Sequence, residues 1–506
     1  MEEGELHTMH DSIINSPNTN SVQPSHPDSE YEVNHNDEYH DKLWCVLFDD
    51  GNYKENPMNM SPVRKWIIVI LISLLSVNVT CISSAWSLAS DNIIEHFGIS
   101  HEVSVLGISL YIWGLGTGGI FLSPISEFHG RRIVYVVGLA LMIAFQFLTA
   151  FCDNIGGMLF GRLASGIFGA SFMSVASGTF SDLFDKEHMH YPIMLYGVSP
   201  FLGPLLGPLI SGFVNSHISF RWTFYIMIIW SGALLALLIV IVPETYQPVL
   251  LHWKAQRLRK ETGDNRYYAP IERDKESLFE SIILSSKRPI LLLVKDPMML
   301  VLCFYSGFCL AIVYMFFVAI PYIFKTVYDF NLSQQGMSFL GLMVGMLIAS
   351  IGTPTYVQKK HEELVRKNNG VAKPEFRFLA LMAGVFFVPI GLFILAWTTY
   401  RKVHWIAPII GSAVFGFATV LVFNGIFAYT VEAYRLYTAS AMAANSFVRS
   451  LMSGVFPLFG LQMYEHMGIH WASTLLALFG CLLIPVPFLF YRYGEKLRSL
   501  SPYAWS

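Results

Sequence analysis

Charged residues are scarce in this chain: Asp, Glu, Lys and Arg make up 14% of its 506 positions, whereas 54% are hydrophobic. An average soluble domain has about 25% charged residues. The apolar residues here are also gathered into long runs, and about 20 consecutive apolar residues suffice for a helix to cross a bilayer core. The composition therefore excludes an ordinary soluble protein and favours an integral membrane protein.

Other absences narrow the function. The chain has only six cysteines, four of them inside apolar runs, so we expect no disulfide framework. It has no glycine-rich nucleotide loop ending in Lys-Ser or Lys-Thr, so the energy source is expected to be an ion gradient. No cluster of His and carboxylates marks a membrane enzyme, and the histidines of the N-terminal tail lack metal-ligand spacing. We therefore predict no enzyme activity, no metal and no cofactor.

Twelve apolar runs are long enough to cross the membrane, which predicts an all-α integral membrane fold with two six-helix halves. The predicted domains are an N-terminal tail (1–65), the first half (66–242), a central loop (243–296), the second half (297–491) and a C-terminal tail (492–506). The predicted spans are 66–89, 103–125, 133–151, 155–177, 190–213, 222–242, 297–323, 334–356, 378–398, 404–430, 437–461 and 471–491.

The basic residues are placed unequally about these spans. Of the 33 Lys and Arg, 27 fall on the side of the two tails and the central loop, four fall on the other side, and Arg162 and Arg449 lie inside helices. The positive-inside bias thus places both termini and the central loop in the cytoplasm. We expect the plasma membrane as the location, with the vacuole as the alternative.

Two polar segments lie outside the spans. Residues 1–41 combine many Ser, Asn, Asp, Glu and His with few apolar residues, which predicts disorder. The stretch from Lys254 to Gly263 is basic and predicts an amphipathic helix along the inner leaflet, or a solvated linker between the halves. A basic stretch tethered between membrane spans is a poor candidate for nucleic-acid binding.

The segment Gly197 to Pro208 contains three glycines and three prolines within an apolar run. Such a helix needs the interior of a membrane bundle, where neighbours satisfy freed backbone groups and small residues allow close packing. Gly203, Gly207 and Ser211 recur every four residues and predict one closely packed flank. A kinked helix with only a packing role is the alternative.

Several motifs carry a family resemblance. Gly197, Gly203, Pro204 and Gly207 look like the helix-five signature of major facilitator antiporters. A basic hairpin with Glu127, Gly130, Arg131 and Arg132 resembles that superfamily's loop between helices two and three, with Ser123 and Phe128 as departures. Asn56 to Ser61 and Pro243-Glu244-Thr245-Tyr246 are similar to elements of fungal multidrug transporters. The chain is identified by resemblance as a fungal twelve-spanner drug:proton antiporter of the major facilitator superfamily.

The resemblance also implies sites for proton coupling. Arg162 lies where the family has its helix-four arginine; burying it costs at least about 2.5 kcal/mol, unless it snorkels to the outer surface. Asp182, at the inner end of that helix, resembles the acid that fungal antiporters use, although a solvated capping carboxylate is the alternative. Glu432, which leaves helix ten, is the next candidate.

The predicted function is export of lipophilic or cationic drug-like molecules in exchange for protons, by alternating access of a monomer in the lipid bilayer. The alternatives are transport of a polyamine or another nutrient, and a membrane sensor without transport. Aromatic and amide side chains could line the cavity, although packing or lipid contact is the alternative for each aromatic residue. These candidates are Tyr111, Trp113, Phe304, Tyr305, Tyr314, Asn424 and Asn445.

Overall fold

A computed structural model of the chain describes residues 44–48, 56–185, 188–272, 278–499, 501 and 503–504. The chain divides into two compact units, Met1–Cys45 and Val46–Ser506. The disorder predicted for residues 1–41 lies outside the described residues. Everything below concerns the second unit, whose regular elements are all helices in the part that is described.

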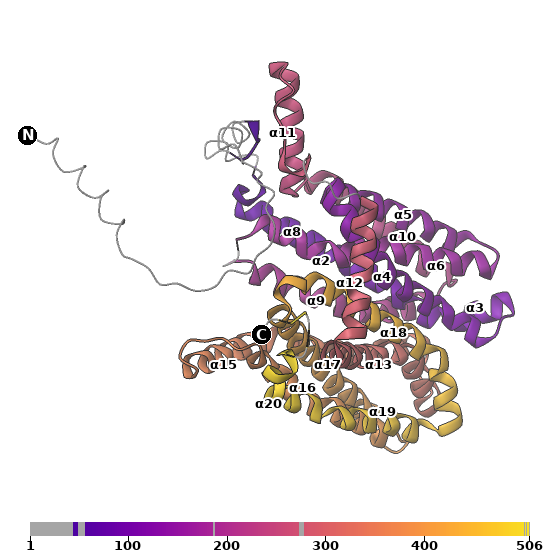
Figure 1. Cartoon of the computed structure of the whole chain (residues 1–506). Helices are drawn as coiled ribbons and strands as arrows, with labels where there is room; N and C mark the ends of the chain where they lie inside the picture. Colours follow the sequence, from indigo (N-terminus) through magenta and orange to yellow (C-terminus); the bar gives the residue numbers. More distant parts are fainter. Residues whose placement is uncertain are drawn as a thin grey trace, which may run out of the picture. The chain divides into compact units, whose positions relative to one another are not determined.

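The first half of this unit contains the helices that correspond to predicted spans one to six (Figure 1). They are η1 (Pro57–Asn59), α2 (Pro62–Ala85), η2 (Ser87–Ala89), α3 (Ser90–Phe97), α4 (His101–His129), α5 (Arg131–Phe151), α6 (Ile155–Gly169), α7 (Ser171–Ser174), α8 (Ala176–Leu183), α9 (His190–Asn215) and α10 (Arg221–Ile241).

The central segment and the second half follow. The central segment contains α11 (Gln247–Thr262), η3 (Pro270–Glu272) and α12 (Leu278–Lys295). The second half contains α13 (Pro297–Tyr328), α14 (Leu332–Gly352), α15 (Pro354–Lys367), η4 (Pro374–Arg377), α16 (Phe378–Thr398), α17 (Ile406–Ala433), η5 (Arg435–Tyr437), α18 (Thr438–Met467), α19 (Ile469–Leu483) and α20 (Pro485–Ser499).

Each of the twelve predicted spans coincides with a helix or a run of consecutive helices. Eleven segments among the described residues are long and apolar enough to cross a membrane. The remaining predicted span, 437–461, corresponds to α18, which has 30 residues but contains Asn445 and Arg449 among several serines. Because α18 packs against α13 and α4, its polar residues lie within the helix bundle.

Polar contacts between the halves show that α2 and α13 run parallel. Ser83 Oγ of α2 lies 3.1 Å from the Tyr314 hydroxyl of α13. Asp91 of α3, which continues the segment of α2, pairs with Lys325 of α13 at 2.9 Å, so residue numbers increase in the same direction along both segments. We call the end where α2 and α13 begin the near end and the opposite one the far end. Gln462 also donates to Glu102 across the halves at the far end.

The predicted close packing of α9 is present on two sides. A Cβ atom on Gly203 would lie 1.9 Å from Thr80 Oγ1, and one on Gly207 would lie 2.1 Å from Ser84 Oγ, so both glycines touch α2. Further along α9, a Cβ atom on Gly212 would meet Gly336 of α14 in the second half. Gly197 differs, because nothing lies within 4 Å of the Cβ position there.

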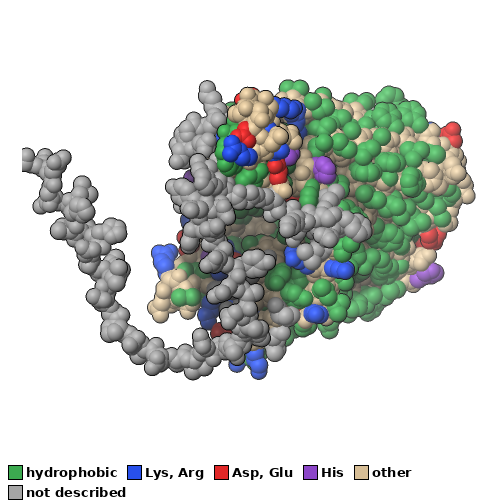
Figure 2. Space-filling view, turned by 45° about the horizontal axis from the view of Figure 1, so that its top comes forward, with side chains coloured by type: hydrophobic (Ala, Val, Ile, Leu, Met, Phe, Trp, Pro, Cys, Tyr) green, Lys and Arg blue, Asp and Glu red, His purple; other side chains and the backbone are tan. Residues whose placement is uncertain are grey.

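The basic stretch of the central loop is helical, as predicted: α11 ends at Thr262, and Gly263 follows with a left-handed φ of 71°. Leu251 and Ala255 of α11 pack on Val46 and Ala269 in a small apolar cluster apart from the main bundle. Figure 2 shows that hydrophobic side chains cover most of the visible face of the helix bundle, with charged groups toward its two ends. This surface fits a lipid environment.

These contacts predict different consequences for three glycine-to-leucine changes in α9. Gly203→Leu and Gly207→Leu should each lower the melting temperature of the detergent-purified protein, because an overpacked contact costs about 1–3 kcal/mol. Gly197→Leu is the matched control and should leave the melting temperature unchanged. Equal melting temperatures for all three variants would show that α9 does not depend on its contact with α2.

Candidate functional site

Arg162 is buried at membrane depth, with a side chain only 1% exposed. Its guanidinium donates to three backbone carbonyl oxygens: Gly107 at 2.8 Å, Ile82 at 2.9 Å and Ser83 at 2.9 Å. The last two belong to the final turn of α2, where carbonyls lack the N–H partners of a continuing helix. Arg162 therefore ties α6 to α2 and α4, and it does not snorkel.

Two aromatic rings complete this environment. The Arg162 guanidinium carbon lies 4.4 Å from the ring centroid of Tyr111 and 5.4 Å from that of Trp86. Such faces stabilise a cation, more strongly when water is absent. The Tyr111 hydroxyl donates to Val79 O, so this predicted cavity residue packs beneath Arg162 with its polar group occupied.

Three of the predicted hairpin residues, Gly130, Arg131 and Arg132, surround the carboxylate of Glu244, whose motif was recognised in the sequence but was given no role there. Glu244, just after α10, accepts hydrogen bonds from the backbone N–H groups of Arg131 (2.9 Å) and Arg132 (3.1 Å) at the start of α5. Gly130 has a φ of 96°, and a Cβ atom there would lie 2.4 Å from the Glu244 carboxylate. The hairpin glycine thus lets an acid cap α5, whereas Glu127 is exposed.

The two predicted proton carriers each meet an arginine at the near end. Asp182 Oδ2 lies 3.4 Å from Arg131 Nε, and its side chain is 14% exposed. Glu432 Oε1 lies 2.6 Å from Arg377 Nε, with a side chain 24% exposed. Neither acid is a freely solvated cap, so each is part of an ion pair within its own half.

A second near-end pair in the C-terminal half joins Glu375 and Arg498. Their side chains are each 6% exposed, and Oε1 lies 2.9 Å from Nε. A Cβ atom on Gly494 would meet this carboxylate at 2.6 Å, so a glycine again permits close approach to an acid. Each half therefore has its own buried carboxylate network at the near end, which the basic residues predict to face the cytoplasm.

The other predicted cavity residues occupy several environments. Tyr314 is buried and bonded to Ser83, while Asn445 donates to Ser306 Oγ at 2.7 Å. Trp113 donates to Leu451 O at 3.2 Å, across the two halves. The hydroxyl of buried Tyr305 has no hydrogen-bond partner among the described residues. Phe304 and Asn424 are exposed.

Arg449 of α18 was recognised as an intramembrane residue but was given no role. Its guanidinium carbon lies 5.5 Å from the ring centroids of Phe423 and Phe427 on α17. The Phe423 ring also contacts Phe201 of α9, with centroids 5.3 Å apart. Arg449 thus lies close to where α9 of the first half meets α17 of the second, near the predicted cavity residues Tyr314 and Asn445.

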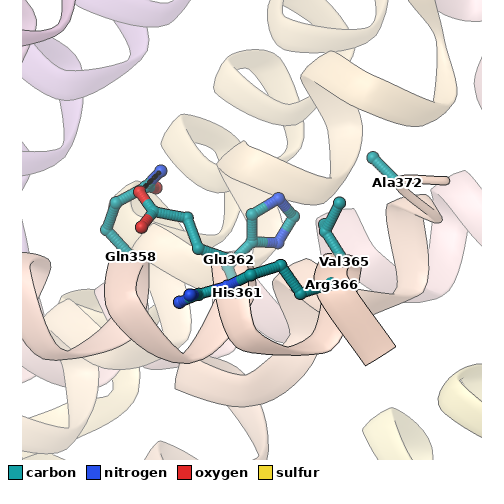
Figure 3. Close-up of a pocket in the computed structure, with 6 residues that line it drawn as sticks. All are labelled: Gln358, His361, Glu362, Val365, Arg366 and Ala372. Carbon is teal, nitrogen blue, oxygen red and sulfur yellow. Dashed lines mark hydrogen bonds between the residues drawn. The ribbon is translucent and has the colours of Figure 1, made fainter. Parts of the chain in front are cut away.

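An open pocket lies outside the spans, on α15 and the loop that follows it (Figure 3). Gln358 and Glu362 lie side by side and share a 3.1 Å hydrogen bond. Burial and the charge of Arg377 lower the pKa of His361. The pocket is lined by Gln358, His361, Glu362, Val365, Arg366 and Ala372, and none of these is a predicted transport-site residue. Among the described residues, no cluster of His, Cys, Asp and Glu could hold a metal ion.

Comparisons with known proteins agree with this architecture. The chain is 54% identical over 449 residues to the probable drug/proton antiporter YHK8 of Saccharomyces cerevisiae, covering 88% of this chain and 87% of that protein. It is 42% identical to the efflux pump atB of Aspergillus terreus, covering 91% and 90%. It is 37% identical to the multidrug transporter mdrA of Aspergillus fumigatus, covering 90% and 75%.

Solved structures agree at the level of the fold. The xylose transporter XylE of Escherichia coli, in a partially occluded inward-open conformation, superposes with a TM-score of 0.59 at 14% identity and covers 85% of this chain and 99% of its own. Residues 67–457 match the Major Facilitator Superfamily. Since that match extends from α2 into α18 and covers more than half of the chain, with the glycine-rich α9 and the basic hairpin, the chain belongs to the Major Facilitator Superfamily.

Proposed function

We propose that this protein exports drug-like small molecules across a membrane in exchange for protons. The observation that carries the proposal is the 54% identity, over 87% of its length, to a relative named as a probable drug/proton antiporter. Two further relatives are named as an efflux pump and a multidrug transporter. The protein acts on small molecules as a transporter and not as an enzyme, and the proton gradient takes the place of a cofactor.

The contacts between the halves support an alternating-access mechanism in a monomer. Six side-chain hydrogen bonds among the described residues join the halves. Those between Ser83 and Tyr314 and between Trp113 and Leu451 lie near mid-membrane, and the other four lie toward the far end. The near-end ion pairs of Asp182 and Glu432 stay within their halves. Rocking of one half against the other can therefore break the far-end contacts while each near-end network moves with its own half.

Uptake of a nutrient or polyamine is the second candidate, because the same fold carries xylose transporters. A growth assay separates the two. Expression in an efflux-deficient yeast should raise resistance to some members of a panel of azoles, cycloheximide-like inhibitors and polyamines. Increased sensitivity would favour uptake, and no effect with the protein shown at the surface would favour a sensor.

Asp182 is proposed as the proton carrier, since it is a mostly buried acid whose ion-pair partner among the described residues, Arg131, lies at a long 3.4 Å. In inside-out vesicles, Asp182→Asn should reduce proton-driven substrate accumulation at least about tenfold, because the side chain no longer titrates. Substrate binding should be unchanged. Exposed Asp185→Asn is the matched control. Full proton-driven accumulation by Asp182→Asn would show that Asp182 is not the proton carrier, and Glu432→Gln would be tested next.

Arg162→Lys should be a poor substitute, because an ammonium group cannot span the three carbonyls that the planar guanidinium holds. We expect a lower melting temperature and at least about tenfold slower export, since charged hydrogen bonds contribute about 1.5–3 kcal/mol each. Exposed Arg401→Lys is the control. Unchanged export by Arg162→Lys would show that only the positive charge of Arg162 matters. Unchanged export by Arg162→Ala would show that Arg162 has no role in transport.

The orientation follows from the basic residues and is also a proposal: both termini and residues 243–296 face the cytoplasm of a plasma-membrane protein. In a cysteine-free background, a cysteine at position 260 of α11 should resist a membrane-impermeant maleimide added to intact cells and react after permeabilisation. A cysteine at position 402, between α16 and α17, should react in intact cells. Labelling at 260 from outside would overturn this orientation.

A further inference from the structure

The two charged groups deepest in the described helices are both cations. Arg162 lies seven residues into α6, and Arg449 lies 11 residues into the 30-residue α18. Since a helix rises about 1.5 Å per residue, Arg449 is roughly 5 Å from the midpoint of α18. Every Asp and Glu in the spanning segments lies within about two turns of a segment end. The described membrane interior therefore has no anion to balance these charges.

The two arginines differ in how their charge is stabilised. Arg162 has three carbonyl acceptors, as described above. Arg449 makes no hydrogen bond to any residue that the structure describes, and its Nε is buried without a partner. Two phenyl faces, those of Phe423 and Phe427, stabilise its charge. An arginine has five N–H donors, so the donor capacity of Arg449 is unused.

The surroundings of Arg449 come from both halves of the protein. Its charge is near enough to interact with the hydroxyls of Tyr196 on α9 and Tyr314 on α13. Tyr196 donates to Phe172 O, and Tyr314 is bonded to Ser83, so these hydroxyls are held by the first half. Arg449 as a residue is only half-buried, so part of it stays accessible within the bundle. The result is an apolar, aromatic site with one unsatisfied cation.

We infer that Arg449 is a substrate-binding residue that selects small aromatic or lipophilic molecules carrying an anionic group, such as a carboxylate. This inference rests on the proposed export function and names the substrate class of the same site. A carboxylate would satisfy two guanidinium donors in a bidentate pair, while the rings of Phe423, Phe427 and Phe201 would contact its apolar body. A cationic molecule of the same shape would meet a like charge and no carboxylate at that depth.

The first test uses the wild-type protein, purified in nanodiscs, and three probes with one ring system: 1-naphthoate, 1-naphthylmethylamine and 1-naphthalenemethanol. Equilibrium dialysis at pH 7 should give the carboxylate at least about tenfold tighter binding than the amine, with the alcohol between them, as expected for one charge-assisted pair. Failure of 1-naphthoate to bind, or equal or tighter binding of the amine, would overturn the inference.

The second test uses variants of the arginine. Arg449→Gln should lose the preference for the carboxylate while keeping its affinity for the alcohol, and Arg449→Lys should keep part of the preference. Exposed Arg401→Gln, which removes a charge outside the bundle, should bind like wild type. If Arg449→Gln does not fold, the Arg449→Lys variant and the binding of the three probes to the wild-type protein still test the inference. If Arg449→Gln still prefers the carboxylate to the same extent, another residue selects the anionic group and the inference is wrong.

Transport separates this inference from the proposed function. Inside-out vesicles with an acidic lumen should accumulate 1-naphthoate more than 1-naphthylmethylamine, after correction for passive flux in vesicles without the protein. Accumulation of the amine alone would leave proton-driven export standing and overturn the substrate class. If 1-naphthoate binds through Arg449 but no compound of the panel is transported, the binding inference stands and the export proposal fails.

Discussion

The structure depends on how positive charge is stabilised inside a bilayer. A charged guanidinium is costly in hydrocarbon, and Arg162 offsets that cost by donating to the carbonyls that the end of α2 leaves unpaired. The same α2 receives Gly203 and Gly207 of α9 on another flank. Helix α2 is thus held by a charge on one side and by close backbone packing on another, and its Ser83 also reaches Tyr314 in the second half.

Much of the fold could be predicted because membrane helices obey local rules. Length and apolarity alone locate the spans, and the glycines of α9 predict a close contact because no side chain at Gly203 or Gly207 would fit. The same rules also predict α18, because its apolar run is long enough to cross the membrane although its polar residues make it less hydrophobic. The helix of the central loop could be predicted from the basic stretch Lys254 to Gly263, and the structure adds that Gly263 ends it with a left-handed φ.

The site was harder to predict, since its contacts join residues far apart in the chain. Glu244 caps α5 from 113 positions beyond Arg131, and nothing in the local sequence marks that pairing. The acceptors of Arg162 are backbone atoms, which every residue has, so no residue type indicates them. Arg449 could be recognised as costly, but its lack of a hydrogen-bond partner among the described residues depends on how α9, α13 and α17 meet around it.

The distribution of polar contacts constrains the motion that the fold permits. Neutral bonds between the halves, such as Ser83 to Tyr314 and Ser216 to Ser333, contribute about 1 kcal/mol each, so a few can be exchanged for other contacts at low cost. The buried pair of Glu375 and Arg498 would be expensive to separate, because each charge would lose its partner in a poorly hydrated place. Motion between the halves therefore costs less free energy than rearrangement within either half. Arg449 lies at mid-membrane, close to helices of both halves, so it is well placed to connect substrate binding to the alternation between the two access states.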